Sequence, residues 1–310
     1  MNIKKSSMFI LIPFLSLLFN ALSAKSSEEP LAPALYVLGD SLADSGNNNG
    51  LPTQAKANYV PYGIDFNGGV SGRFTNGNTM ADFIAQLLGL PLAPPYLGLS
   101  EAERSQIITG LNYASGSAGI LPETGSRLGK NIPIGEQIDY FQRTVEIDLP
   151  RNFTEPQALF NHLSKSIFLV SVGSNDYINN YLQPDYYNSS KYFSPQRFAG
   201  LLVDELSQHL TRLYKLGARK IIVFEIGILG CMPSITNTID FSKDCDKEVN
   251  RLVITYNAQL SILLTKLKSL LEGSIFIQGQ VFLPGYVIYH SPYYFGEILK
   301  HLCLMGRDGF

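Results

Sequence analysis

A short apolar run that ends abruptly in glycine, aspartate and serine constrains this chain more than any other feature. The run covers residues 34–38, and Gly39, Asp40 and Ser41 follow it directly. Four to eight apolar residues that end at turn-forming residues are typical of a buried strand in a parallel sheet. Ser41 is therefore expected just past the carboxyl end of a strand, which is where open α/β sheets bind their ligands.

A serine in this position is a candidate nucleophile, which needs a base beside it and hydrogen-bond donors for a developing oxyanion. A second interpretation stays open on the tripeptide alone, in which Asp40 and Ser41 only cap the following segment. Asp40 and the nearby Asp44 can each accept hydrogen bonds from their own turn, so we assign neither a catalytic role. The Gly-x-Ser-x-Gly elbow of α/β-hydrolases is absent from the sequence, which argues against that fold.

The rest of the chain alternates predicted strands with predicted amphipathic helices, which indicates one α/β domain with a mostly parallel sheet flanked by helices on both faces. Apolar runs predict further strands over residues 166–172, 220–226 and 275–281, and a short one over 107–113. Apolar residues at helical spacing predict helices over residues 78–88, 135–147, 154–163, 195–216 and 247–271. Asn78 is the expected cap of the first helix. Thr154 and Gln157 are the expected capping box of the third helix. Residues 177–193 are predicted to be loop.

A long segment over residues 47–78 is rich in glycine, asparagine and proline. A loop of this length inside one domain is usually functional. We expect Arg73 and Phe74 to pin the loop to the body of the domain, with direct substrate contact as the alternative.

Three sequence blocks resemble the plant GDSL esterase/lipase family of the SGNH hydrolases. They are Gly-Asp-Ser-Leu-Ala-Asp-Ser-Gly-Asn-Asn-Asn at residues 39–49, Asn-Tyr-Ala-Ser-Gly-Ser-Ala-Gly at 112–119 and Val-Gly-Ser-Asn-Asp-Tyr at 172–177. Residues 72–77 resemble a further signature of the same family. The blocks follow the family's order, so the resemblance implies an SGNH-hydrolase-like three-layer sandwich and a secreted serine hydrolase of carboxylic esters.

The resemblance also implies roles for three residues of these blocks. It makes Ser41 the nucleophile, and it forms the oxyanion hole from the backbone N–H groups of Ser41 and Gly116 and the side-chain amide of Asn175. Taken singly, Gly116 is equally well a turn glycine and Asn175 a cap on the next segment. The implied substrate is a small ester or a lipid, and nothing in the sequence demands a metal or an organic cofactor.

The base that such chemistry needs is not identified. The family supplies it through a late Asp-x-x-His motif, and no aspartate here lies three residues before His162, His209, His290 or His301. From about residue 287 the sequence also stops resembling the family. We therefore expect a chain that is truncated or altered at its C-terminus and impaired as an enzyme. The alternatives are a non-catalytic ligand-binding protein or an inactive isoform.

The N-terminus resembles a secretory signal peptide over residues 1–24, which leaves residues 25–310 as the single domain. Lys4 and Lys5 precede an apolar stretch over residues 8–22, and small residues follow it. A membrane anchor is the alternative, but the stretch is shorter than a spanning helix requires. The formal net charge is -2 without a block of like charges, so we expect no nucleic-acid partner.

The chain has 3 cysteines, which fit no zinc pattern. In an oxidising compartment Cys231 and Cys245 can close a short loop, and the family resemblance points to the same pair. Cys303 is then left without a partner. Asn152 and Asn188 begin N-glycosylation sequons, which would be used if the chain is secreted.

Overall fold

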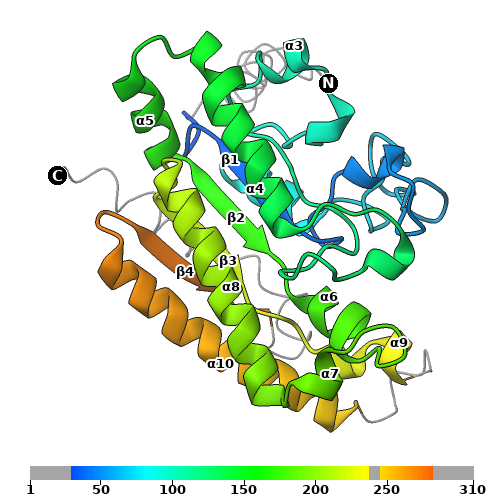
Figure 1. Cartoon of the computed structure of the whole chain (residues 1–310). Helices are drawn as coiled ribbons and strands as arrows, with labels where there is room; N and C mark the ends of the chain where they lie inside the picture. The colour runs from blue at the N-terminus through cyan, green and yellow to red at the C-terminus, as the bar shows by residue number, and fades with distance from the viewer. Residues whose placement is uncertain (1–28, 237–244, 282–310) are drawn as a thin grey trace, which may run out of the picture. The chain divides into compact units, whose positions relative to one another are not determined.

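The computed structural model describes residues 29–236 and 245–281. The chain divides into two units, Met1–Pro30 and Leu31–Phe310, and every element named below belongs to the second. Within the described residues a 4-stranded sheet lies at the centre of this unit (Figure 1). Its strands are β1 (Leu35–Gly39), β2 (Ile167–Ser171), β3 (Lys220–Phe224) and β4 (Ile275–Gly279).

The strand order is β1-β2-β3-β4, and every pair of neighbours is parallel. The register places Gly39 of β1 opposite Ser171 of β2, so the carboxyl ends of the strands meet at one edge of the sheet. This arrangement confirms the predicted parallel α/β sheet. The segments that follow the strands, including Ser41, therefore gather at that edge.

The segment at residues 109–115 runs beside β1 without forming one of these strands. Leu35 N–H donates to the Thr109 carbonyl at 3.0 Å, and Val37 N–H donates to the Leu111 carbonyl at 3.0 Å. Further along, Ser115 N–H donates to the Gly39 carbonyl at 3.1 Å. The strand predicted at 107–113 is thus a strand-like neighbour of β1, and it delivers the following residues to the carboxyl edge.

Helices cover both faces of the sheet, as the alternating pattern predicted. They are α2 (Met80–Leu87), α3 (Glu101–Arg104), α4 (Ile134–Arg143), α5 (Pro156–Lys165), α6 (Ser174–Asp176), α7 (Ser189–Tyr192), α8 (Pro195–Lys215), α9 (Pro233–Thr236) and α10 (Lys247–Leu270). Figure 1 shows α4, α8 and α10 on one side of the sheet. On that side Tyr36, Phe168 and Ile221 pack into one apolar cluster with these helices. Because strand side chains alternate, their neighbours Leu35 and Val37 join α2 in a second cluster.

The two longest helices begin at caps that the sequence contains. Ser194 accepts a hydrogen bond from Arg197 N–H, and Pro195 occupies the first turn of α8. Asp246 accepts from the N–H groups of Glu248 and Val249 at the start of α10. Gly217 follows α8 with a φ of 107°, a conformation that glycine adopts without strain.

Two predicted caps are wrong in detail. Thr79, not Asn78, caps α2, because Thr79 and Asp82 form a reciprocal capping box. The expected capping box of Thr154 with Gln157 does not form, because Pro156 opens α5 and makes Glu155 its N-cap without a side-chain hydrogen bond.

Two element boundaries also differ from the prediction. The helix expected over 135–147 ends at Arg143 and continues as a π-helical turn over Thr144–Asp148. The segment predicted as loop over 177–193 contains a helical turn at Tyr177–Tyr181 and the short helix α7. Both differences are short turns, which apolar periodicity does not detect.

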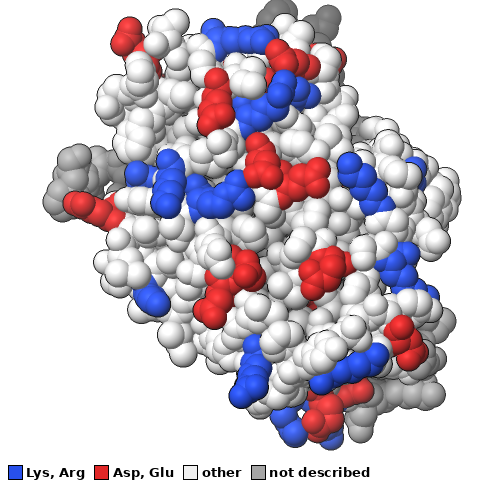
Figure 2. All heavy atoms as spheres, in the orientation of Figure 1, with Lys and Arg blue, Asp and Glu red and all other residues white. Residues whose placement is uncertain are grey.

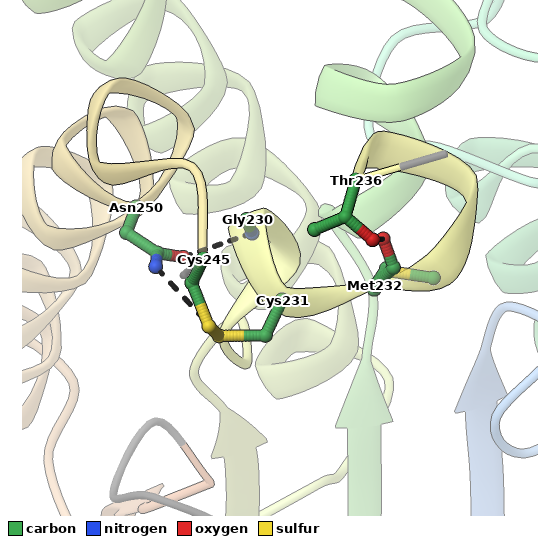
Figure 3. The surroundings of a disulfide bond; sticks show 6 residues. All are labelled: Gly230, Cys231, Met232, Thr236, Cys245 and Asn250. Atoms are coloured by element: carbon green, nitrogen blue, oxygen red, sulfur yellow. Dashed lines mark hydrogen bonds between the residues drawn. A yellow bond between two sulfur atoms is a disulfide. The ribbon is translucent and has the colours of Figure 1, made fainter. Parts of the chain in front are cut away.

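A disulfide joins Cys231 and Cys245 (Figure 3). It links the 3₁₀ turn Leu229–Cys231, which follows β3, to the residues just before α10. Asn250 of α10 reinforces the junction, because its Oδ1 accepts from Gly230 N–H at 2.9 Å. The structure therefore forms the pair suggested by the sequence, while Cys303 lies outside the described residues.

On the face shown in Figure 2, acidic and basic side chains are interspersed among uncharged surface, and in places they adjoin. One surface ion pair connects helices, since Arg212 of α8 lies 2.5 Å from Asp139 of α4. Of the helices in the described part of the chain, none is both long and apolar enough to cross a bilayer.

Candidate active site

A cavity of about 330 Å³ opens at the carboxyl edge of the sheet. Its walls include the residues that follow three neighbouring strands, with Ser41 after β1, Ser174 after β2 and Ile226 after β3. Most of the remaining wall is apolar, and Leu42 and Phe74 contribute to it. The edge that the sequence marked as the ligand site thus carries a hollow of ligand size.

Ser41 lies in the cavity wall while its neighbours are held firmly. The Asp40 carboxylate accepts from Leu42 N–H at 3.0 Å, and the Asp40 carbonyl accepts from the N–H groups of Ala43 at 3.1 Å and Asp44 at 3.0 Å. Within residues 29–236 and 245–281, no group pairs with the Ser41 hydroxyl or with its backbone N–H. The turn therefore presents both a hydroxyl and an N–H donor toward a ligand.

Asp40 and Asp44 are both fully enclosed carboxyl groups. Burial raises the pKa of Asp40 to about 7, and the neighbouring Asp176 and Asp44 carboxyls add to the shift. Burial also raises the pKa of Asp44 to about 6, against the hydrogen bonds that it accepts. Perturbed carboxyl groups of this kind cluster at functional sites. Asp40 accepts hydrogen bonds from its own turn, which is one of the two interpretations that the sequence left open.

Asp44 connects the Ser41 turn to the second sequence block. Its carboxylate accepts from the N–H groups of Gly46 at 2.7 Å, Asn47 at 2.8 Å and Gly116 at 2.9 Å. The Gly116 N–H, which the family resemblance assigns to the oxyanion hole, is thus already paired with Asp44. An oxyanion at this N–H has to share the hydrogen with Asp44 or displace it.

Phe74 occupies the space that a side chain at position 116 would need. A Cβ on Gly116 would lie 2.5 Å from Phe74 Cζ, so only glycine fits beneath the ring. Arg73, in turn, forms two hydrogen bonds to the Asp82 carboxylate of α2, at 2.7 and 2.9 Å. Arg73 therefore pins the long loop, whereas its neighbour Phe74 lines the cavity beside Ser41.

Asn175 lies in α6, directly after β2, and is 4% exposed. Its Nδ2 donates to the Ala118 carbonyl at 2.9 Å, and its Oδ1 accepts from Asn179 at 2.7 Å. An amide nitrogen carries two hydrogens, and the second has no partner in the described part of the chain. Asn175 therefore keeps one donor available.

Asp176, the neighbour of Asn175, holds the segment directly after the second block against the third block. Its carboxylate accepts from Ile120 N–H at 2.8 Å, Leu121 N–H at 3.0 Å and the Thr124 hydroxyl at 2.7 Å. Burial raises its pKa to about 6. The three blocks that resemble the family are thus connected through buried carboxylates, although Gly116 and Asn175 do not themselves line the cavity.

The described histidines do not line the cavity. His162 of α5 is buried and lies 3.4 Å from the Tyr36 hydroxyl, near the opposite, amino end of the strands. His209 of α8 lies against Gly135 of α4, because a Cβ added at Gly135 would be 3.2 Å from His209 Cε1. His290 and His301 lie outside the described residues. Among the residues that the structure describes, no histidine is therefore available to Ser41.

The sequence analysis did not single out two residues of the site, Glu225 and Asn47. Glu225 lies in the cavity wall, and its carboxylate accepts from Gln278 Nε2 at 2.8 Å and Val281 N–H at 3.0 Å. Asn47 donates to the carbonyls of Asn112 at 2.9 Å and Ala114 at 2.8 Å, which fixes the segment that leads to Gly116. Their positions in the sequence could have indicated both residues, because Glu225 follows a strand and Asn47 belongs to the first block.

In the part of the chain that the structure describes, no group of three or more His, Cys, Asp or Glu side chains is placed to hold a metal ion. The polar groups of the site are hydroxyls, amides and carboxyls instead. Such groups suit the binding of a neutral acyl compound.

Comparison with known proteins assigns the chain to a family. Residues 35–277 match the family described as GDSL-like Lipase/Acylhydrolase. The chain is 42% identical over 308 residues to GDSL esterase/lipase 7 of Arabidopsis thaliana, covering 98% of this chain and 84% of the relative. It is 47% identical over 247 residues to GDSL esterase/lipase At1g71691 of the same plant, covering 80% of this chain and 63% of the relative.

A solved structure gives a much weaker likeness. It is an active site mutant of a family two carbohydrate esterase from Clostridium thermocellum, which is 11% identical and aligns with a TM-score of 0.38 over 89% of this chain and 64% of that chain. This likeness is too weak to support an argument. The sequence matches are sufficient by themselves, and they confirm the family that the three blocks indicated: the chain belongs to the GDSL lipase/acylhydrolase family of ester hydrolases.

Proposed function

We propose that this protein hydrolyses carboxylic esters through an acyl intermediate on Ser41. The observation that carries the proposal is the unpaired Ser41 hydroxyl in the wall of a cavity at the carboxyl edge, on a turn fixed by Asp40 and Asp44. Leu42 and Phe74 make the adjoining wall apolar. This wall supports an ester with an apolar acyl group, such as a lipid ester, as the substrate class.

In the proposed reaction the Ser41 oxygen attacks the ester carbonyl carbon and loses its proton to solvent water, because the described residues bring no histidine to Ser41. The resulting tetrahedral oxyanion accepts hydrogen bonds from Ser41 N–H and from the second hydrogen of Asn175 Nδ2. Gly116 N–H is the third donor, and it either shares its hydrogen between the oxyanion and Asp44 or exchanges Asp44 for the oxyanion. Collapse of the intermediate releases the alcohol and leaves the acyl group on Ser41. Water then attacks the acyl-enzyme and releases the carboxylic acid.

We further propose that the 310-residue chain turns over slowly. It contains no Asp-x-x-His sequence, and the described residues bring no histidine to Ser41. Loss of a triad base lowers the rate by about 10⁶-fold in well-studied serine hydrolases, and roughly 10³ to 10⁴-fold catalysis over water remains from the oxyanion donors and from binding.

The test is reaction of the purified chain with a fluorophosphonate, followed by mass spectrometry to locate the adduct. We expect slow labelling that is confined to Ser41 and that Ser41→Ala abolishes, while Ser174→Ala in the same cavity keeps the adduct on Ser41. Absence of any Ser41 adduct in a chain shown to be folded would overturn the assignment of the nucleophile. Ester turnover as fast as that of an ordinary esterase would overturn the proposal of impairment.

A non-catalytic ligand-binding role is the second candidate. The observation that favours it is the same cavity without a histidine among the described residues that line it. Saturable binding of a fatty-acyl ester, with neither turnover nor an adduct on Ser41, would establish this role in place of hydrolysis.

We also propose that the protein is secreted, with residues 1–24 as its signal peptide and residues 25–310 as the mature domain. The charged and apolar pattern of the N-terminus and the Cys231–Cys245 disulfide support this proposal. Asn152 and Asn188 are both exposed, but the Nδ2 of Asn152, the atom that carries a glycan, donates to the Ser105 carbonyl at 2.6 Å, so Asn188 is the sequon with the freer amide nitrogen. Expression of the full chain in plant cells should give a glycoprotein in the medium, and a purely intracellular product would contradict the proposal.

A further inference from the structure

The last backbone unit of β1, two residues before Ser41, is held by a side chain from a helix. Gln137 lies in α4 and is completely buried, with 0% of its surface exposed. Its Oε1 accepts from Gly39 N–H at 2.8 Å, and its Nε2 donates to the Gly39 carbonyl at 2.8 Å. The same Nε2 donates to the Ile132 carbonyl at 2.7 Å. Gln137 therefore uses three of the four hydrogen bonds that an amide side chain offers.

Gln137 replaces a backbone partner at this point. Leu35 and Val37 donate to the carbonyls of Thr109 and Leu111 in the adjacent segment. If that pattern continued by two residues, Gly39 N–H would donate to the carbonyl of residue 113. The structure instead gives the Gly39 N–H to Gln137, at the point where the adjacent segment leads toward Gly116.

The network continues from Gln137 to the second block. Ile132 N–H donates to Ser115 Oγ at 3.0 Å, and that hydroxyl donates to Asn48 Oδ1 at 2.6 Å. Asn48 Nδ2 then donates to the Gly116 carbonyl at 3.0 Å. A continuous set of buried hydrogen bonds thus joins the strand end before Ser41 to Gly116.

We propose that Gln137 is a positioning residue, which holds the Ser41 turn and the Gly116 loop in their relative arrangement. The inference rests on the proposed ester hydrolysis at Ser41, because positioning matters only if these groups act on one substrate. Gln137 acts through Gly39 and Ser115 and does not line the cavity itself. A displacement of about 1 Å of a reacting group lowers rates by about 10²-fold.

The chain contains a matched amide elsewhere on the same edge. Asn257 of α10 is 7% exposed, and its Oδ1 accepts from Ile226 N–H at 2.9 Å while its Nδ2 donates to the Ile226 carbonyl at 2.9 Å. This is the same bidentate contact, two residues after β3 instead of at the end of β1. Among the described residues Asn257 makes no hydrogen bond to the Ser41 turn, so its removal serves as a control for general loosening.

The first experiment compares Gln137→Leu with Asn257→Leu in the full chain. We expect Gln137→Leu to slow fluorophosphonate labelling of Ser41 by about 10²-fold and Asn257→Leu to slow it at least tenfold less. Hydrogen–deuterium exchange gives a second measurement that does not need activity. Peptides covering residues 36–44 should exchange faster in Gln137→Leu, and peptides covering residues 222–228 should exchange faster in Asn257→Leu.

The conservative variant Gln137→Glu separates positioning from simple stability. Its ionised carboxylate can accept from Gly39 N–H but cannot donate to the two carbonyls, and protonation restores one donor. We therefore expect the labelling rate of Gln137→Glu, relative to wild type, to recover as the pH is lowered from 8 to 5. At pH values where both proteins are fully folded, a side chain without a positioning role predicts no such recovery.

Several outcomes would overturn the proposal. Equal slowing of Ser41 labelling in Gln137→Leu and Asn257→Leu would show general loosening, and unchanged exchange over residues 36–44 would show that Gln137 does not hold the turn. If Gln137→Leu does not fold, the pH profile of Gln137→Glu decides. If wild type is never labelled at Ser41, the proposed function fails, and the exchange data still decide whether Gln137 holds the turn.

Discussion

The carboxyl edge of the sheet and the layer formed by α8 and α10 are stabilised by different kinds of contact. At the edge, buried polar side chains pair with backbone groups, as Asp44 does with Gly116 and Asp176 with Ile120. In the helix layer the buried side chains are mainly apolar, with Phe198 and Leu206 of α8 completely enclosed.

The difference separates the candidate active site from the part of the fold that supplies most of its stability. Burial of apolar surface is favourable at any position and needs no particular partner. A buried polar group is tolerated only where its partners are in place, so each one fixes a local geometry. The edge is therefore the part in which small changes alter geometry and protonation, and the helix layer is the part in which they alter stability alone.

The largest effect that we expect is a dependence of folding stability on pH, which arises at the carboxyl edge and not in the helix layer. The pKa of Asp40 in the folded chain is about 7, against an ordinary value of 3.8. Between these values the folded state binds more protons than the unfolded state, so stability falls as the pH rises from about 4 to about 7. The full difference corresponds to on the order of 4 kcal/mol.

The measurement is urea unfolding of wild type and of Asp40→Asn at several pH values. Asp40→Asn keeps an oxygen acceptor for Leu42 N–H but cannot ionise, so its stability relative to wild type should increase as the pH rises. A constant difference between the two proteins across this range would contradict the raised pKa of Asp40.

The second prediction concerns the helix layer. Phe198 is 0% exposed and packs against the rings of Tyr177 and Tyr181, at centroid distances of 5.5 and 4.6 Å. We expect Phe198→Ala to lower the free energy of unfolding by about 3 to 4 kcal/mol, through lost burial and a residual cavity. Phe83→Ala on α2, where the side chain is 54% exposed, should stay within about 1 kcal/mol of wild type.

Both variants are measured by urea unfolding at a single pH and again across the range used for Asp40. Phe198→Ala should shift the unfolding midpoint by the same amount at every pH in this range, because burial raises the pKa of both ring partners, Tyr177 and Tyr181, further above it. A pH-dependent shift would mean that the helix layer and the edge are coupled, against the comparison drawn above.

The apolar elements and the polar edge also differ in how much of each could be predicted from the sequence. The strands and the helices α8 and α10 were predictable because their apolar periodicity reflects burial, which dominates their energetics. The caps depended on single hydrogen bonds. Asn78 and Thr79 are both suitable caps, and only the acidic Asp82 three residues after Thr79 decides between them.

The site was predictable only where a motif marked it. The three blocks made Ser41, Gly116 and Asn175 candidates, but they did not indicate that Asp44 takes the Gly116 N–H, because that contact spans 72 residues of sequence. Gln137 left a usable signal. It lies at helical spacing with the buried Ile134, Ile138 and Phe141, so a polar residue occupies an inward-facing position of α4. Such a residue requires buried partners, although the sequence does not say which.

The smallest expected effect lies on the surface, where charged side chains remain in contact with water. The side chains of Arg212 and Asp139 are 39% and 61% exposed, and their ion pair links α8 to α4. A double-mutant cycle with Arg212→Gln and Asp139→Asn should give a coupling free energy below about 1 kcal/mol, falling further in added salt. The same cycle on the Arg73–Asp82 pair, with side chains 7% and 3% exposed, should give a clearly larger and salt-insensitive coupling. Equal couplings would mean that burial does not set the strength of these contacts, and the distinction between the enclosed edge and the rest of the molecule would fail.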